Sequence, residues 1–381
     1  MMIQKRKKIL FISNSLADMI KCRGHIMSRI AKEGHKVFLI APDDNQIAPS
    51  HELEMITQYN WFLRSKNHNP FLEVLSFFHL LWLLIVIKPD LVFSYTVKPN
   101  LYISFLRKFF KFNNCSIVTG LGRIFTIRNP FYLVMRKIVF CSFKSANQVW
   151  VMNRFDYLYL KQIKSHSVVR HMPGEGVDIE KFAPQQKSFN APEAESRSLP
   201  KFLFIGRLLK SKGLEELMQA TKILSERGLK VPLTVIGPYD AKDPDKIDKH
   251  QFDALVKQGL INYLGVIDDV RQAISQCDCL ILPSYREGLP RVILEASAME
   301  RPVITTKVPG CQDLVKDGMT GFLIPSHSSK SLANAIEKFL KLSEEKRRQL
   351  GIEGRKFIKS HFTINHVQNF YLGALENLVQ S

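Results

Sequence analysis

The chain has 381 residues, of which 45% are hydrophobic and 23% charged, and its formal net charge is +19. This composition excludes an intrinsically disordered protein, and the length exceeds what one hydrophobic core usually supports, so we expect two domains. Residues 1–185 hold 26 Lys and Arg against 12 Asp and Glu. An anionic partner is therefore expected for the first half, whether a lipid surface, a phosphorylated acceptor or nucleic acid.

Strand and helix patterns alternate along the first half. Gly24–Lys32 is predicted to be a helix. The predicted strands are Lys8–Ser13, Lys36–Ala41, Leu91–Ser94, Ser116–Thr119 and Gln148–Met152. Val74–Ile87 is the most apolar stretch, but it is shorter than the about 20 residues that span a bilayer. We expect it to be a buried helix that packs on the strand after it.

Two segments of the first half combine cations with apolar residues. Asn129–Gln148 has the pattern of a basic amphipathic helix, which suits a bilayer interface or, alternatively, a packed helix with a solvated basic edge. Phe105–Phe112 interleaves Arg and Lys with Phe, which suits a lipid interface or single-stranded nucleic acid. Because no RNA-binding module is recognisable, lipid is the better supported partner.

A second series of alternating elements begins after a polar, proline-containing stretch. Its helix is Leu214–Glu226, and its strands are Lys201–Ile205, Leu233–Ile236, Ile261–Tyr263, Cys279–Leu282 and Val303–Thr305. The alternation predicts an α/β fold with two doubly wound parallel sheets. We expect a first domain at 1–183, a linker at 184–200, a second domain at 201–360 and a C-terminal helix at about 361–381.

Two glutamates, Glu287 and Glu295, stand eight positions apart across the end of a predicted strand and a predicted helix, Arg291–Met299. In a parallel sheet this is the edge where ligands bind, and the N–H groups of a helix start attract phosphate. Glu295 has apolar neighbours, among which an unpaired charge would be costly. A hydroxyl-rich ligand would satisfy both carboxylates, although each could also be an ordinary surface acid.

Two cations follow the first strand of the second series. Arg207 offers a planar fork of donors and Lys212 a compact charge, and both could converge on a diphosphate. Lys210 is the competing cation, and we expect it to face solvent.

Five collinear motifs resemble the retaining glycosyltransferases of the GT-B fold, the group often called family 4. The glutamates match its E-x7-E signature, and Ile205–Gly213 matches its G-R-L…K-G segment. The other three are Gly176-Val177-Asp178 with Phe182 and Pro184, Pro302–Thr306 with Gly310, and Asp317–Ile324. One such motif would be weak evidence, but five in the family's order are strong.

The resemblance implies two Rossmann-like domains facing a cleft, with the C-terminal helix crossing back onto the first domain. It implies that Glu287, Arg207 and Lys212 act on a nucleotide-sugar donor, with Glu295 accepting from its ribose. The remaining donor contacts implied are Gly206, Gly288, Leu289 and Pro290. No metal and no cofactor are expected, because Arg207 and Lys212 would supply the positive charge that a metal cation could otherwise provide.

The first domain is expected to hold the acceptor. Thr119–Arg123 is similar to the G-L-G segment of bacterial enzymes that extend polyprenyl-diphosphate-linked glycans, so Gly120, Gly122 and Arg123 are candidate acceptor contacts, with a plain turn as the alternative. Arg23, near the first loop, is a fourth candidate. The family's glycine-rich loop after the first strand is absent, and Met299-Glu300-Arg301-Pro302 lacks the family's glycine before proline. That second departure is expected to change helix capping more than chemistry.

The expected function is transfer of a hexose or N-acetylhexosamine, expected to be UDP-linked, to a polyprenyl-diphosphate-linked glycan in bacterial surface-polysaccharide or glycoconjugate biosynthesis. Six scattered cysteines favour the cytoplasm, and the basic half favours peripheral attachment to the inner face of the cell membrane, with no nucleic acid partner. The alternatives are a sugar-nucleotide epimerase of the same fold, or a non-catalytic basic protein that binds membrane or nucleic acid.

Overall fold

The computed structural model describes residues 6–42, 54–63, 70–121, 129–162, 167–184 and 199–380. The chain folds into two units, the first comprising Met1–Glu175 with Ile364–Ser381 and the second Gly176–Thr363. The expected boundaries were residues 183 and 361. Segment 176–182 lies with the second unit because Val177 N–H donates to the carbonyl of Phe362 at 2.9 Å and Arg355 donates to the carbonyls of Ile179 and Phe182, both at 3.3 Å. The expected linker falls largely outside the described residues.

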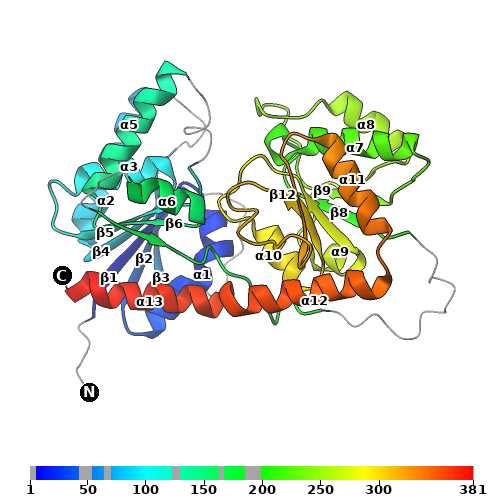
Figure 1. Ribbon diagram of the computed structural model, residues 1–381. Helices are drawn as coiled ribbons and strands as arrows, with labels where there is room; N and C mark the ends of the chain where they lie inside the picture. The colour runs from blue at the N-terminus through cyan, green and yellow to red at the C-terminus, as the bar shows by residue number, and fades with distance from the viewer. Residues whose placement is uncertain are drawn as a thin grey trace. The chain divides into compact units, whose positions relative to one another are not determined.

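The first unit is a seven-stranded parallel sheet of order β3-β2-β1-β4-β5-β6-β7. Its strands are β1 (Lys8–Ile12), β2 (Lys36–Ala41), β3 (Ile56–Asn60), β4 (Leu91–Tyr95), β5 (Asn113–Val118), β6 (Gln148–Val151) and β7 (Val168–His171). Its helices are α1 (Leu16–Lys32), α2 (Pro70–Ile87), α3 (Val97–Leu106), α5 (Pro130–Ser145), α6 (Arg154–Gln162) and α13 (Ile364–Gln380). Helix α13 runs along this unit next to α1 (Figure 1).

The second unit is a six-stranded parallel sheet of order β10-β9-β8-β11-β12-β13. Its strands are β8 (Phe202–Ile205), β9 (Leu233–Ile236), β10 (Asn262–Tyr263), β11 (Cys279–Leu282), β12 (Val303–Thr306) and β13 (Gly321–Ile324). Its helices are the 3-10 turn η3 (Lys210–Lys212), α7 (Leu214–Glu226), α8 (Lys249–Lys257), α9 (Arg271–Gln276), α10 (Arg291–Ala298), α11 (Ser329–Leu340) and α12 (Glu344–His361). The predicted fold of two parallel α/β sheets is confirmed.

The strand predictions missed both edges of the first sheet. β3 and β7 lie at its two edges, and their side chains are mostly exposed or half-buried. An edge strand that is solvated lacks the continuous apolar run by which a central parallel strand is recognised. The first predicted helix is also longer than expected, because α1 begins at Leu16, where the Ser15 hydroxyl accepts from the N–H of Asp18 at 3.2 Å.

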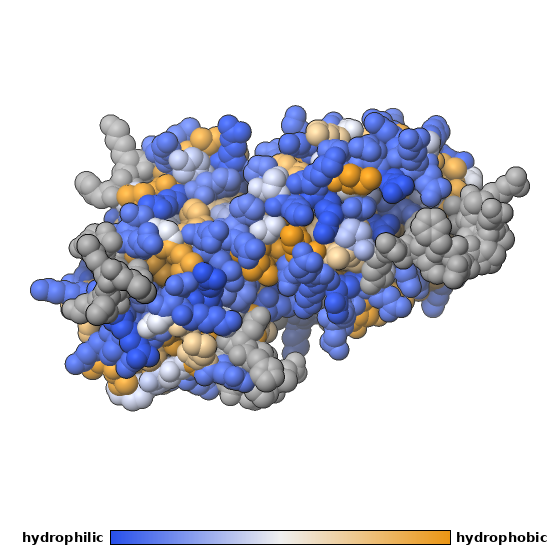
Figure 2. All heavy atoms as spheres, turned by 90° about the horizontal axis from the view of Figure 1, so that it is seen from below, coloured by the Kyte–Doolittle hydropathy of each residue, from blue (hydrophilic) through white to orange (hydrophobic). Residues whose placement is uncertain are grey.

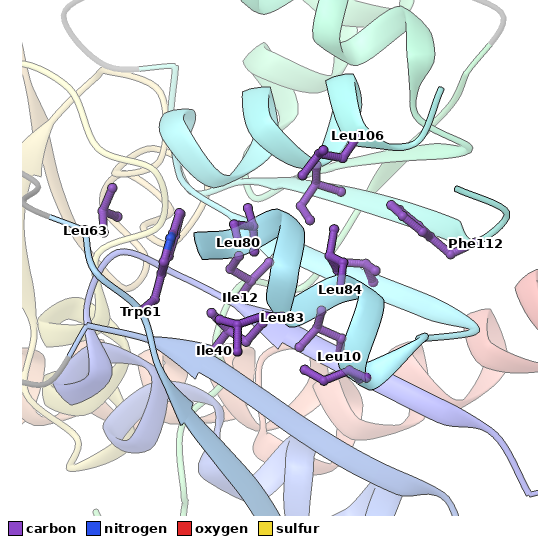
Figure 3. Close-up of a cluster of buried hydrophobic side chains, with 13 residues drawn as sticks. Leu10, Ile12, Ile40, Trp61, Leu63, Leu80, Leu83, Leu84, Leu106 and Phe112 are labelled. Carbon is purple, nitrogen blue, oxygen red and sulfur yellow. The ribbon is translucent and has the colours of Figure 1, made fainter. Parts of the chain in front are cut away.

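Helix α2 has two apolar faces, and only one is buried. Leu80, Leu83 and Leu84 pack against Leu10 and Ile12 of β1 in the core of the first unit (Figure 3). The opposite face is exposed, with side chains of Phe71, Val74, Leu75, Phe78, Trp82, Ile85 and Val86 between 43% and 69% accessible. The expectation of a buried helix is therefore right for one side only. Among the helices in the described ranges, none is long and apolar enough to cross a bilayer.

Candidate active site

The predicted donor residues lie at the carboxyl ends of two central strands of the second sheet. β8 and β11 are neighbours, and the chain leaves β8 toward β9 on one side and β11 toward β12 on the other. Such a reversal of strand order is where ligands bind in open α/β sheets. The loop after β8 carries Arg207 and Lys212, and the loop after β11 carries Glu287.

Glycine permits these loops to approach one another closely. Gly213 has φ +72°, and a Cβ built on it would lie 2.0 Å from the carbonyl oxygen of Pro283, which follows β11. Gly310, after β12, has φ +84°, and its Cβ would lie 2.6 Å from the carbonyl oxygens of Glu287 and Gly288. Any side chain at either position would push the loops apart. The loops that follow β8, β11 and β12, three adjacent strands, therefore lie in contact with one another.

Lys212 and Glu287, which are 75 positions apart in sequence, form an ion pair at this point. Lys212 Nζ lies 2.6 Å from Glu287 Oε1, and their side chains are 28% and 11% exposed. The same oxygen accepts from the hydroxyl of Ser284 at 2.7 Å. An ammonium has three donors, so Lys212 can keep Glu287 and still bind an anionic ligand. The carboxylate is held in one orientation by two donors.

Arg207 lies in the same loop as Lys212, and its guanidinium contacts Asp243 at 2.5 Å. The Arg207 side chain is 49% exposed, which leaves donors of its planar fork facing solvent. The β9–α8 segment is fastened to the loop nearby, because Asp245 accepts from the N–H of Ser211 and from its hydroxyl. Lys210 pairs with Glu215 at 3.1 Å and is 48% exposed, so it faces solvent as predicted.

Glu295 lies in α10, whose N-cap is Pro290. The residue is 8% exposed among the buried side chains of Ile293, Leu294 and Ala296, and its carboxylate accepts from Arg291 Nη2 at 3.2 Å. Gly288, Leu289 and Pro290 lead into this helix start, where the first backbone N–H groups of any helix have no intrahelical acceptor. The site therefore combines a helix N-terminus, two cations and two carboxylates.

Burial raises the pKa of two groups beside the glutamates. The Cys311 thiol has its pKa raised to about 12, chiefly by burial and also by the negative charge of Glu287. The pKa of Tyr285 is raised by burial and by its hydrogen bonds to Glu216, whose two oxygens each lie 2.8 Å from the phenol oxygen. Both groups therefore stay protonated near neutral pH, and neither adds charge to the site.

Of the acceptor candidates of the first unit, the structure describes Arg23 and Gly120. Arg23 is 4% exposed, and its guanidinium lies 2.6 Å from Glu175 and 4.3 Å from the ring centre of Tyr95. This placement gives Arg23 a structural contact inside the unit and does not support an acceptor contact. Gly120 follows β5 with φ +148°, which favours glycine. Gly122 and Arg123 lie outside the described residues.

Two residues of the site were not expected from the sequence. Ser284 stands three positions before Glu287, and that spacing within one loop was its only available signal. Asp243 gave no local signal, because its role comes from a partner 36 positions away. In the described part of the chain, no three His, Cys, Asp or Glu side chains gather in a way that could hold a metal ion.

Comparison with known families gives two matches that together span most of the chain. Residues 185–357 match the glycosyl transferases group 1, and residues 8–153 match a glycosyl transferase 4-like domain.

Three relatives come from bacteria. Residues covering 42% of the chain are 34% identical to the capsular polysaccharide biosynthesis glycosyltransferase CapM of Staphylococcus aureus, over 41% of that protein. The chain is 25% identical, over 90% of its length and 91% of the relative's, to an N,N'-diacetylbacillosaminyl-diphospho-undecaprenol alpha-1,3-N-acetylgalactosaminyltransferase of Campylobacter jejuni. A UDP-Gal:alpha-D-GlcNAc-diphosphoundecaprenol alpha-1,3-galactosyltransferase of Escherichia coli is 28% identical over 53% of this chain and 54% of its own length.

Solved structures show the same fold over nearly the whole chain. A sucrose-phosphate synthase of Thermosynechococcus elongatus superposes with a TM-score of 0.79 at 22% identity, covering 98% of both chains. Anabaena HepE in complex with UDP and glucose gives 0.77 at 17% identity, covering 98% of this chain and 100% of the other. At these identities the likeness concerns the fold.

Proposed function

This chain is a glycosyltransferase of the group 1 type with a glycosyl transferase 4-like domain, and we propose that it is a retaining enzyme acting on a lipid-linked acceptor. The donor is a nucleotide-diphosphate sugar, UDP-linked as the name of the Escherichia coli relative suggests for that protein. The transferred group is a hexose or an N-acetylhexosamine. The product belongs to a surface polysaccharide or glycoconjugate.

The observation that carries the proposal is the Lys212–Glu287 ion pair, with Arg207 in the same loop as Lys212 and Glu295 in the helix that follows Glu287. In the reaction the bond between the sugar and the β-phosphate breaks and a bond from the sugar to the acceptor oxygen forms. The acceptor hydroxyl gives up its proton to the nucleoside diphosphate, which leaves. Negative charge grows on the leaving phosphate. Fixed cations aimed at that position stabilise the transition state more than the bound donor.

Each charged residue has a distinct role in this mechanism. Lys212 neutralises the β-phosphate while holding Glu287, and Arg207 adds its solvent-facing guanidinium donors on the other side. Glu287 accepts from a hydroxyl of the transferred sugar and offsets positive charge on its ring. Glu295 accepts from the ribose, which replaces part of its contact with Arg291. The helix start at Gly288–Pro290 meets donor oxygens.

The acceptor is proposed to be a polyprenyl-diphosphate-linked glycan, because relatives carrying such names match up to 90% of the chain. The first unit supplies the acceptor side, with Gly120, Gly122 and Arg123 as candidate contacts. Its positive charge suits both the diphosphate of such an acceptor and the anionic membrane in which it resides. The enzyme acts at the cytoplasmic face of the membrane.

The test is release of nucleoside diphosphate from a panel of nucleotide sugars, with bacterial membrane extract as acceptor. We expect release from one donor, dependent on the acceptor, and lost in Glu287→Gln and Arg207→Ala. The matched controls are Glu226→Gln and Arg348→Ala, which change the same charges at exposed positions of the second unit. Both controls should retain activity.

Two results would refute the transferase proposal. Isomerisation of the sugar of a nucleotide sugar in the absence of any acceptor would assign the site to an epimerase. Failure of every donor to bind or turn over, together with salt-sensitive binding of RNA, would assign the chain to the non-catalytic alternative.

A further inference from the structure

The exposed side of α2 forms a continuous apolar face. Its members, Phe71, Val74, Leu75, Phe78, Trp82, Ile85 and Val86, recur at steps of three and four, which places them on one side of the helix. Phe71 is 69%, Phe78 59% and Trp82 55% exposed. Single exposed apolar residues are normal on a protein surface, but seven of them side by side on one helix mark a binding surface.

This apolar face continues onto the end of α3. Phe77 lies between the two helices, with its ring centre 5.9 Å from that of Phe78 and 5.7 Å from that of Phe105. Phe105 in turn contacts Phe109 at 5.5 Å, and these two residues are 50% and 70% exposed. On the face of the molecule seen in Figure 2, by comparison, hydrophobic residues form separate patches among hydrophilic ones.

A basic hollow borders the aromatic end of this face. It measures about 970 Å³ and is lined by Lys7, Arg107, Lys108, Lys111 and Lys144, with Asp90 as its one carboxylate among the lining residues. Asp90 already accepts from the N–H of Lys8 at 2.7 Å. Within the described ranges the four lysines have no carboxylate partner. The charge of the hollow is therefore available to an anion.

Lys108 connects the hollow to the apolar face, because its ammonium lies 5.9 Å from the ring centre of Phe105. The hollow also lies at the amino ends of the strands, next to Asn113 at the start of β5 and Asn147 before β6. Ligands of parallel sheets bind at the opposite, carboxyl edge. The hollow is therefore a separate feature from any substrate pocket of that sheet.

We propose that the apolar face of α2 and α3, together with the basic hollow, docks on an anionic lipid bilayer. The aromatic and aliphatic side chains enter the boundary between headgroups and acyl chains, and the lysines of the hollow bind lipid phosphates. Aromatic residues and cations side by side match the chemistry of that boundary better than that of a protein partner. The inference specifies the membrane partner of the proposed function, but docking requires neither donor nor acceptor.

The protein contains a built-in probe of this docking. Of its three tryptophans, Trp61 and Trp150 are buried at 1% and 0% exposure, and Trp82 lies on the apolar face. The experiment mixes the full chain with vesicles of phosphatidylcholine, or of equal parts phosphatidylcholine and phosphatidylglycerol, without nucleotide sugar. We expect co-sedimentation with the anionic vesicles, a blue shift of tryptophan emission and quenching by brominated lipid. Trp82→Phe should still sediment while losing the shift.

Charge and apolar variants separate the two parts of the surface. Lys108→Gln with Lys111→Gln should weaken binding to anionic vesicles about 30-fold, because each lysine near an anionic surface contributes about 1 kcal/mol. The control, Lys230→Gln with Lys257→Gln, removes two exposed lysines of the second unit and should bind as wild type. Phe78→Ala with Phe109→Ala should reduce the blue shift and binding together.

Three outcomes would overturn the proposal. The first is absence of vesicle binding, and the second is binding that leaves the emission of Trp82 unchanged. The third is an equal loss of vesicle affinity in the Lys108/Lys111 variant and in the Lys230/Lys257 control. A vesicle-free, concentration-dependent blue shift would assign the face to a second copy of the chain instead. To separate this test from that of the proposed function, nucleoside diphosphate release is also measured with a water-soluble acceptor analogue and no membrane. Loss of vesicle binding with release retained refutes the docking alone, and vesicle binding without release refutes the reaction alone.

Discussion

Replacing Lys212 by methionine tests the central pair of the site. The Lys212 ammonium lies 2.6 Å from the Glu287 carboxylate, and the Glu287 side chain is 11% exposed. Removing the ammonium therefore leaves a nearly buried negative charge whose remaining donor is the Ser284 hydroxyl. The direct attraction at this distance is about 6 kcal/mol with an effective dielectric constant of about 20, but desolvation offsets most of it. We expect a net loss of about 2 kcal/mol, which lowers the melting temperature by about 4–8 °C.

The activity should fall further than the stability. Removing one group that stabilises charge in the transition state typically costs about 100- to 1,000-fold in kcat. The assay is nucleoside diphosphate release at saturating donor, with thermal unfolding of the same preparations. Glu287→Gln in the Lys212→Met background should restore about 1–2 kcal/mol of stability, because no buried charge remains, while activity stays lost.

Lys210→Met is the matched control, two positions away in the same turn. Its pair with Glu215 is exposed on both sides, so its loss should cost less than about 1 kcal/mol and leave kcat unchanged. Equal effects of the two substitutions on stability and on kcat would refute the assignment of Lys212. Additive effects of Lys212→Met and Glu287→Gln would show that the two side chains do not interact in solution.

Three further predictions concern local structure. Gly213→Ala should lower the free energy of unfolding by more than about 2 kcal/mol and abolish donor binding, because its Cβ would clash with Pro283. The control, Gly228→Ala, has a similar φ but open space around it, and should lower the free energy of unfolding by about 1 kcal/mol. Equal melting temperatures of the two variants would contradict this. Glu300→Gly should raise stability by up to about 1 kcal/mol in thermal unfolding, because Glu300 lies just after the C-cap of α10 with φ +58°, where glycine is favoured; a lower melting temperature would contradict it. Burial lowers the pKa of His35 in the folded chain, so the unfolded chain takes up the proton first and stability should fall as pH drops below about 6.5. Urea unfolding at a series of pH values should show that His35→Gln loses less stability on acidification than the wild type. An equal loss of stability in both proteins would refute the assignment to His35.

The central elements of both sheets were predictable because their signals are local. Parallel strands buried on both faces are continuous apolar runs, and the spacing of Glu287 and Glu295 places them at a strand end and in the helix that follows. The motif G-R-L…K-G likewise made Arg207 and Lys212 candidates without knowledge of the fold. These features depend on neighbours that are close in sequence, which the chain itself displays.

Tertiary structure decided which charges meet and which faces are covered. Lys212 reaches Glu287, and Arg207 reaches Asp243, only because the strand order brings separate loops together. Arg23 was predicted to contact the acceptor, but its place in α1 sets it against Glu175 and Tyr95. Helix α2 is the clearest case, because a helix that is apolar all round carries no periodicity to show which side is buried. The sheet beneath it buried one side, and the other was left exposed to form the proposed membrane-docking face.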